Sequence, residues 1–250
     1  MADPRILIHR YALPATAERG ADYAAVLAAS FPSGAGVPFV DTGWTYAIYA
    51  GSKLVYSKTS PGFTATSGTL GWIIPGAALA SEALSDKMQE RWTGPINSIE
   101  YTFTRPFHLV RHALMPAITD VDLTALHSDL LDLKDPDQAT FETQRVDAWN
   151  TLQKWLIMKG NRPQLILDDW AVRDVHRFLA LENIFRDFGQ SAGPDGRYAQ
   201  LADHYRERAR EEFSGLNFAY DYDQDGFDDG ATTKAANPVT LLTVPWGWNR

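Results

Sequence analysis

The chain of 250 residues contains no cysteine. Disulfides, thiolate nucleophiles and cysteine-ligated metal sites are therefore excluded, and this composition fits a reducing cytoplasm. The sequence also has no run of about 18 apolar residues, and it begins without a basic region followed by an apolar stretch and a cleavage site. We therefore expect neither a membrane protein nor an exported one.

Positive charge is scarce. Lysine and arginine number 23 against 31 aspartates and glutamates, which gives a formal net charge of −8. Such a balance argues against a protein that wraps nucleic acid, because that binding depends on many contacts between basic side chains and phosphates. The densest basic run, residues 206–210, is interleaved with Glu207 and followed by Glu211 and Glu212. It therefore predicts a solvated helix face.

The familiar catalytic and nucleotide-binding motifs are missing as well. The sequence has no Gly-x-Ser-x-Gly, no Gly-x-x-x-x-Gly-Lys and no Gly-x-Gly-x-x-Gly after a strand. The adjacent carboxylates at 168–169 and 228–229 are typical of helix caps and turns. We therefore expect a protein that is not an enzyme.

Residues 1–104 are rich in Gly, Ser, Thr, Tyr and Trp, and they predict a β-sandwich or barrel-like domain. Gly51-Ser52 separates two apolar runs and predicts a hairpin. A second strand pair is expected between residues 70–74 and 98–104, and alanine content favours short helices at 23–29 and 77–92. The expected strands are residues 6–8, 39–40, 44–50, 53–56, 70–74 and 98–104.

After Arg105-Pro106 the pattern changes, and residues 105–216 predict an antiparallel α-helical bundle. A short apolar segment at 107–114 comes first, and Thr119-Asp-Val-Asp122 then has the form of a capping box. Three longer helices follow, with apolar residues at helical spacing. They are expected at residues 138–158, from the N-cap Asp168 to 188, and from about 195 to 215.

The middle helix of these three has an unusually wide apolar arc. Contact on two sides would explain the arc. The helix is then either central in the bundle or in contact with a neighbouring subunit, and the assembly hypothesis rests on other subunits covering this surface.

Residues 217–250 predict an extended C-terminal arm that ends in apolar and tryptophan side chains. Because exposed aromatic area of this size normally has a partner, we expect the arm to dock on another chain. The alternative is an edge strand on its own domain. The expected partner-binding residues are Val239, Leu241, Leu242, Val244, Trp246 and Trp248.

Asp221-x-Asp223-x-Asp225-Gly226 matches the opening of a calcium loop, with Asp229 at the ninth position. Position twelve is Thr232 instead of the bidentate glutamate, so a full EF-hand is not supported. Asp221, Asp223 and Asp225 remain candidate calcium ligands, and the alternative is an Asp/Gly-rich turn without an ion.

His108 and His112 are four residues apart, and on a helix they would point toward one zinc ion. No glutamate follows the first histidine, so the metalloprotease pattern fails. We favour packing or interface histidines over a metal site.

The C-terminal half resembles the head-to-tail connector, or adaptor, proteins of tailed bacteriophages. The resemblance covers about residues 105–230 and is a similarity of pattern without a diagnostic signature. It is carried by the expected helices at 141–158 and up to 188, the link 161–168, Tyr198-Ala-Gln-Leu-Ala-Asp-His-Tyr-Arg206 leading to Leu216, and Tyr220-Asp-Tyr-Asp-Gln-Asp-Gly226.

The resemblance implies a structural protein of the virion neck, assembled in the bacterial cytoplasm. It implies a ring, commonly of twelve subunits, that sits under the portal, contacts tail or neck proteins and passes DNA through its lumen without specific binding. The C-terminal arm would then reach the portal. The N-terminal β region departs from the smaller all-helical members of the family. Alternatives are a calcium-dependent binding module, another phage neck, tail or baseplate protein and, less favoured, a metal hydrolase.

Overall fold

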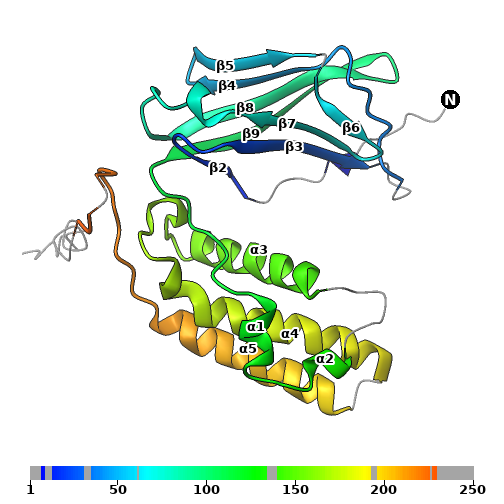
Figure 1. Ribbon diagram of the computed structural model, residues 1–250, viewed down its shortest axis with the longest axis vertical. Helices are drawn as coiled ribbons and strands as arrows, with labels where there is room; N and C mark the ends of the chain where they lie inside the picture. The colour runs from blue at the N-terminus through cyan, green and yellow to red at the C-terminus, as the bar shows by residue number, and fades with distance from the viewer. Residues whose placement is uncertain are drawn as a thin grey trace, which may run out of the picture.

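The computed structural model describes residues 7–8, 13–30, 35–60, 62–133, 140–192, 196–225 and 227–229. Figure 1 shows the strands gathered in one half of the molecule and the helices in the other. Both secondary-structure types are present, so the coarse prediction of a mixed α+β protein is confirmed. No helix within these ranges combines the length and apolarity needed to cross a membrane.

In the described ranges the strands form two sheets. The five-stranded sheet has the order β2-β9-β8-β4-β5, with β2 parallel to β9 and the other pairs antiparallel. The four-stranded sheet has the order β1-β3-β7-β6 and is antiparallel. The strands are β1 (Leu7–Ile8), β2 (Ala15–Glu18), β3 (Tyr23–Ser30), β4 (Thr45–Ala50), β5 (Lys53–Thr59), β6 (Thr64–Thr66), β7 (Thr69–Ile74), β8 (Ser85–Ile96) and β9 (Ile99–Val110).

Side chains from both sheets meet in one buried cluster. Leu27 and Leu70 come from the smaller sheet, and Tyr46, Trp92 and Phe107 come from the larger one. The predicted hairpin at Gly51 is confirmed, since β4 and β5 pair across it and Gly51 adopts a φ of 61°. A positive φ is cheap for glycine because it has no Cβ.

Both short helices predicted in this half are wrong. Residues 23–29 belong to β3, where alternate side chains are buried, including Ala25, Leu27 and Ala29. Residues 77–92 contain only the end of a 3₁₀ turn, η1 (Gly76–Ala78), and the first part of β8. In β3, burial of every second side chain between two sheets outweighs the helix propensity of alanine.

The predicted pairing of residues 70–74 with 98–104 is also wrong. β7 pairs with β3 and β6, whereas β9 pairs with β8 and β2. Residues 39–40 lie outside the strands, beside an isolated bridge between Pro38 and Ser67. β9 continues through Arg105-Pro106 to Val110, so residues 107–110 are strand and not the start of a helical segment.

A buried ion pair in the five-stranded sheet also bonds a tyrosine from the other sheet. Glu90 on β8 is 1% exposed, and its Oε1 accepts a 2.6 Å hydrogen bond from Nε of Arg105 on β9. Its Oε2 accepts from the hydroxyls of Tyr46 at 3.0 Å and Tyr23 at 3.2 Å, the latter from β3 of the other sheet. Burial raises the pKa of Glu90, although Arg105 and the tyrosine hydroxyls oppose that rise.

The helical half contains α1 (Asp120–Thr124), α2 (Leu130–Leu133), α3 (Glu142–Met158), α4 (Arg173–Ala192) and α5 (Arg197–Gly215), with the 3₁₀ turns η2 (Pro163–Leu165) and η3 (Asp169–Val172) before α4. The capping box at Thr119 is confirmed, and Gly160 follows α3 with a φ of 84°. Asp168 caps η3 by accepting a hydrogen bond from the Trp170 N–H, so the long helix α4 begins at Arg173 and not directly after Asp168 as predicted. Helix periodicity and end signals therefore predicted this half well.

The wide apolar arc belongs to α4, which packs against both α3 and α5 (Figure 1). The arc residues Val175, Phe178, Leu179, Leu181 and Phe185 are all buried within this one chain. The central-helix explanation is thus confirmed. The expectation that other subunits cover the apolar arc of this helix is therefore wrong, because α3 and α5 already cover it.

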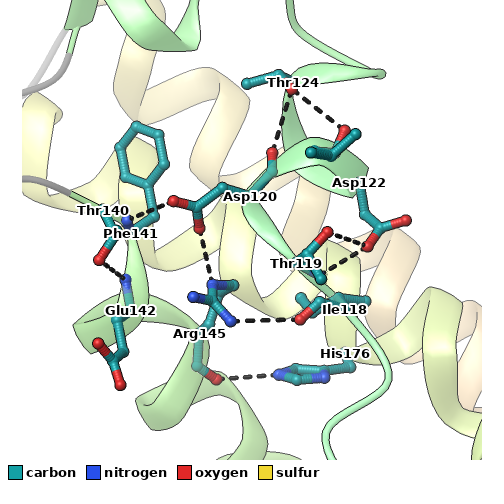
Figure 2. A network of polar contacts seen from close by, with 11 residues as sticks. Ile118, Thr119, Asp120, Asp122, Thr124, Thr140, Phe141, Glu142, Arg145 and His176 are labelled. Atoms are coloured by element: carbon teal, nitrogen blue, oxygen red, sulfur yellow. Dashed lines mark hydrogen bonds and ion pairs between the residues drawn. The ribbon is translucent and has the colours of Figure 1, made fainter.

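Polar contacts fix α1 and α3 against α4 (Figure 2). The Arg145 guanidinium on α3 bonds the Asp120 carboxylate at 2.8 Å and the Ile118 carbonyl at 3.3 Å. The Arg145 carbonyl accepts a 2.9 Å hydrogen bond from Nε2 of His176 on α4. The short helix α1 is therefore held by side chains from elements distant in sequence.

Candidate functional site

The aspartate-rich loop begins where the chain returns from α5 to the segment before α4. Ile166 and Tyr220 form an antiparallel bridge, and the Asp221 N–H donates to the Leu165 carbonyl at 3.0 Å. The Tyr220 hydroxyl also lies 2.7 Å from Oδ1 of Asn161. These contacts fix the first carboxylate of the loop relative to the helical half.

The three predicted calcium ligands come together. Ligand oxygens of Asp221, Asp223 and Asp225 all lie within 4.8 Å of one another, and among the described residues this is where three metal-ligating side chains meet. Backbone donors already engage them: the Asp225 N–H lies 2.9 Å from Asp221 Oδ1 and 3.1 Å from Asp223 Oδ1. The Phe227 N–H donates to Asp225 Oδ1 at 2.8 Å. The loop is therefore closed by its own amides, which is the usual role of aspartate in turns.

Like charges crowd this loop. A hydrogen bond from the Asp225 N–H lowers the pKa of Asp223, but desolvation and the carboxylates of Asp225, Asp229 and Asp221 outweigh it and raise that pKa. A cation in the loop would relieve this repulsion. The Asp229 carboxylate instead accepts from the N–H groups of Tyr222 and Asp223.

Arg111, just after β9, attaches the loop to the sheet half. Its N–H donates to the Gln224 side chain at 3.2 Å, and its guanidinium contacts the carbonyls of Gln224 and Asp225. Gln224 adopts a φ of 58°, in the left-handed region that residues other than glycine rarely adopt. Nothing in the local sequence pairs Arg111 with a loop more than 100 residues away, so sequence reasoning missed it.

The zinc hypothesis for His108 and His112 fails on geometry. His108 lies in β9 and His112 lies beyond its end, so they do not share a helix face. Burial lowers the pKa of His108, which lines a small hollow of about 40 Å³ between the two halves. His112 lies 3.6 Å from both Glu18 and Asp169.

These two carboxylates also hold the segment that joins the halves. Glu18, at the end of β2, accepts from the Ala113 N–H at 3.3 Å. Asp169, in η3, accepts from the Met115 N–H at 3.0 Å. His112 therefore lies at the junction between the two halves.

An exposed apolar surface begins at this junction. Trp170 is 68% exposed, and Met115, held at the same turn through Asp169, is 51% exposed. The Arg173 guanidinium lies 4.8 Å from the centre of the Trp170 ring and also pairs with Asp122 on α1. Trp and Met are enriched in protein interfaces. No sequence pattern predicts a partner for this surface.

The predicted partner-binding residues Val239, Leu241, Leu242, Val244, Trp246 and Trp248 lie outside the described residues. Their docking therefore remains a prediction. No family model, no curated protein and no solved structure matches this chain.

Proposed function

We propose that this chain is a non-catalytic assembly subunit, a connector-like protein that forms a ring between the portal and the tail of a tailed phage. Its N-terminal half is proposed to be a β-sandwich, supported by the single buried cluster to which both sheets contribute. Its C-terminal half is proposed to be the connector-like helical bundle, supported by the packing of α4 between α3 and α5.

The observation that carries the assembly proposal is the exposed pair of Trp170 and Met115. A tryptophan that is 68% exposed leaves a large apolar area in water, and a protein partner would remove it. Further exposed apolar side chains lie on α1, on α2 and on the turn between them, at Val121, Leu126 and Leu131. We assign the exposed Trp170 and Met115, named here the Trp170 surface, to contacts between copies of the chain.

Light scattering over a concentration series tests this proposal. We expect the unaltered chain to form rings whose population rises with concentration, and Trp170→Ser to shift the midpoint to at least about tenfold higher concentration, because a buried interfacial tryptophan typically contributes about 2 kcal/mol or more. Leu54→Ser is the matched control, since Leu54 is a similarly exposed apolar residue on β5. A chain that stays monomeric at every concentration contradicts the proposal.

The C-terminal arm is proposed to bind the portal. Truncation after Asn237 removes the apolar tail and leaves the Trp170 surface in place. We therefore expect the truncated chain to assemble normally but to lose portal binding in a pull-down. Retained portal binding would contradict the role of the arm, separately from the role of the Trp170 surface.

The acidic charge suits a subunit that lines a DNA conduit without gripping it. A net charge of −8 disfavours strong contacts with DNA phosphates, and DNA can move through a ring only if its contacts with the wall are weak. This supports a place in the virion neck next to tail or neck proteins, with assembly in the host cytoplasm.

The second candidate is a calcium-dependent binding module. It is favoured by one observation, the proximity of the Asp221, Asp223 and Asp225 ligand oxygens. Calorimetry with calcium distinguishes it from the assembly proposal, since only the module requires calcium for ligand uptake. A metal hydrolase based on His108 and His112 gains no support from their placement.

A further inference from the structure

A hollow lined by arginines lies among the three long helices. Its volume is about 110 Å³, and its lining includes Arg186 on α4, Arg206 and Arg210 on α5, and Thr151 and Trp155 on α3. Two of these arginines belong to the run at 206–210 that the sequence assigned to a solvated helix face. Packing of α5 beside α4 places that run next to a third arginine.

One carboxylate serves two of the three guanidiniums. Oε1 of the buried Glu182 accepts from Nε of Arg206 at 2.9 Å and from its terminal nitrogen at 2.7 Å. The same oxygen lies 3.6 Å from the Arg186 guanidinium, which also donates to Oδ1 of Asn183 at 2.8 Å. Glu182 therefore offsets about one of the positive charges around the hollow.

Arg210 makes the excess of positive charge clear. Within the described part of the chain, no carboxylate forms an ion pair with it at 4.0 Å or less. It lies four residues after Arg206 on α5, and like charges at this spacing repel each other. Another acidic neighbour, Asp203, lies 3.9 Å from Arg206 and is exposed to solvent, so it offsets little of this charge.

We propose that this hollow binds an oxyanion, specifically a phosphate group as the free ion or a monoester. Guanidinium groups match the geometry of phosphate oxygens and donate two hydrogen bonds at once. The space of about 110 Å³ is several times the roughly 10–15 Å³ that a cavity needs to hold one water, so a group of several heavy atoms fits. A dianion there would relieve the repulsion between Arg206 and Arg210.

Isothermal calorimetry of the full chain with inorganic phosphate tests the site. We expect saturable binding that weakens as sodium chloride is added, because the attraction is electrostatic. Arg210→Gln and Arg186→Gln should each weaken binding about tenfold or more, the effect of losing charge-assisted hydrogen bonds of about 1.5 kcal/mol or more. Both variants should fold. Arg210 is exposed, and replacing Arg186 leaves Glu182 still paired with Arg206.

Arg208→Gln is the matched control, since Arg208 lies on the same helix but pairs with Glu211 at 3.8 Å and does not line the hollow. We expect it to bind phosphate like the unaltered chain. Two results would contradict the site. One is the absence of saturable heat up to about 10 mM phosphate, which is ten times a Kd of about 1 mM. The other is a loss of binding in Arg208→Gln equal to that in Arg210→Gln and Arg186→Gln. A monoester that binds as inorganic phosphate does, with the same response to Arg210→Gln, supports the shared phosphate group as the recognised chemistry.

Discussion

Acid should destabilise this protein through His176. The side chain is 0% exposed, lies on α4 and packs on Trp149, with ring centres 5.1 Å apart. Its Nε2 is 2.9 Å from the Arg145 carbonyl (Figure 2), so the neutral tautomer donates there. Its Nδ1 is buried with no hydrogen-bond partner, and protonating it would place an unpaired N–H in the core.

Burial lowers the pKa of His176 to about 4 from an ordinary value of 6.5; the nearby Arg145 charge adds to this, and the hydrogen bond to the Arg145 carbonyl opposes it. Between these two values the unfolded chain carries a proton that the folded chain does not. The free energy of unfolding therefore falls as pH falls through 6.5 and stops falling below about 4. The pKa difference corresponds to a total loss of about 3 kcal/mol, which is large beside a typical stability of about 5–15 kcal/mol.

Urea denaturation at about pH 7 and about pH 4 measures this loss, and His176→Leu isolates it from the titration of carboxylates. We expect the acid-induced loss of stability to be smaller by about 2–3 kcal/mol in His176→Leu than in the unaltered chain. The exposed His204, changed to leucine, should leave that loss unaltered. An equal acid-induced loss in His176→Leu and the unaltered chain would refute the reasoning.

Two further predictions concern the sheet half. Arg105→Met should lower the unfolding free energy by about 3–5 kcal/mol in urea denaturation, because it leaves Glu90 buried without its cation; adding Glu90→Gln should recover part of that loss, and strictly additive losses would contradict the pairing. Gly94→Ala should lower the free energy of unfolding by about 1–3 kcal/mol in the same assay, because a Cβ there would meet the buried indole of Trp44. An unchanged urea midpoint would contradict this steric argument.

Much of the helical half could be predicted because its signals are local. The capping box at Thr119, the N-cap Asp168 and the apolar spacing along residues 138–158 all act within a few turns of chain. The strands were harder. Residues 23–29 contain four alanines, and only pairing with β7 reveals that they form a strand.

The candidate sites also divide into features set by local sequence and features set by the packing of distant segments. The spacing of Asp221, Asp223 and Asp225 predicted that their carboxylates would meet, because the three lie within five residues. The contacts of Arg111 with that loop, and the placement of Arg186 at the same hollow as two arginines of α5, depend on how distant segments pack.

The sequence by itself determined the acidic charge, the absence of thiol chemistry, the helix ends and the aspartate spacing, since each depends on composition or near neighbours. Only the tertiary structure decided which surfaces are covered. The apolar arc of α4 is the clearest case. The hydrophobic effect favours burial of an apolar surface but does not specify which part of the chain, or which other molecule, covers it. The same arc predicts a central helix or a subunit interface, and α3 and α5 lie on its two sides.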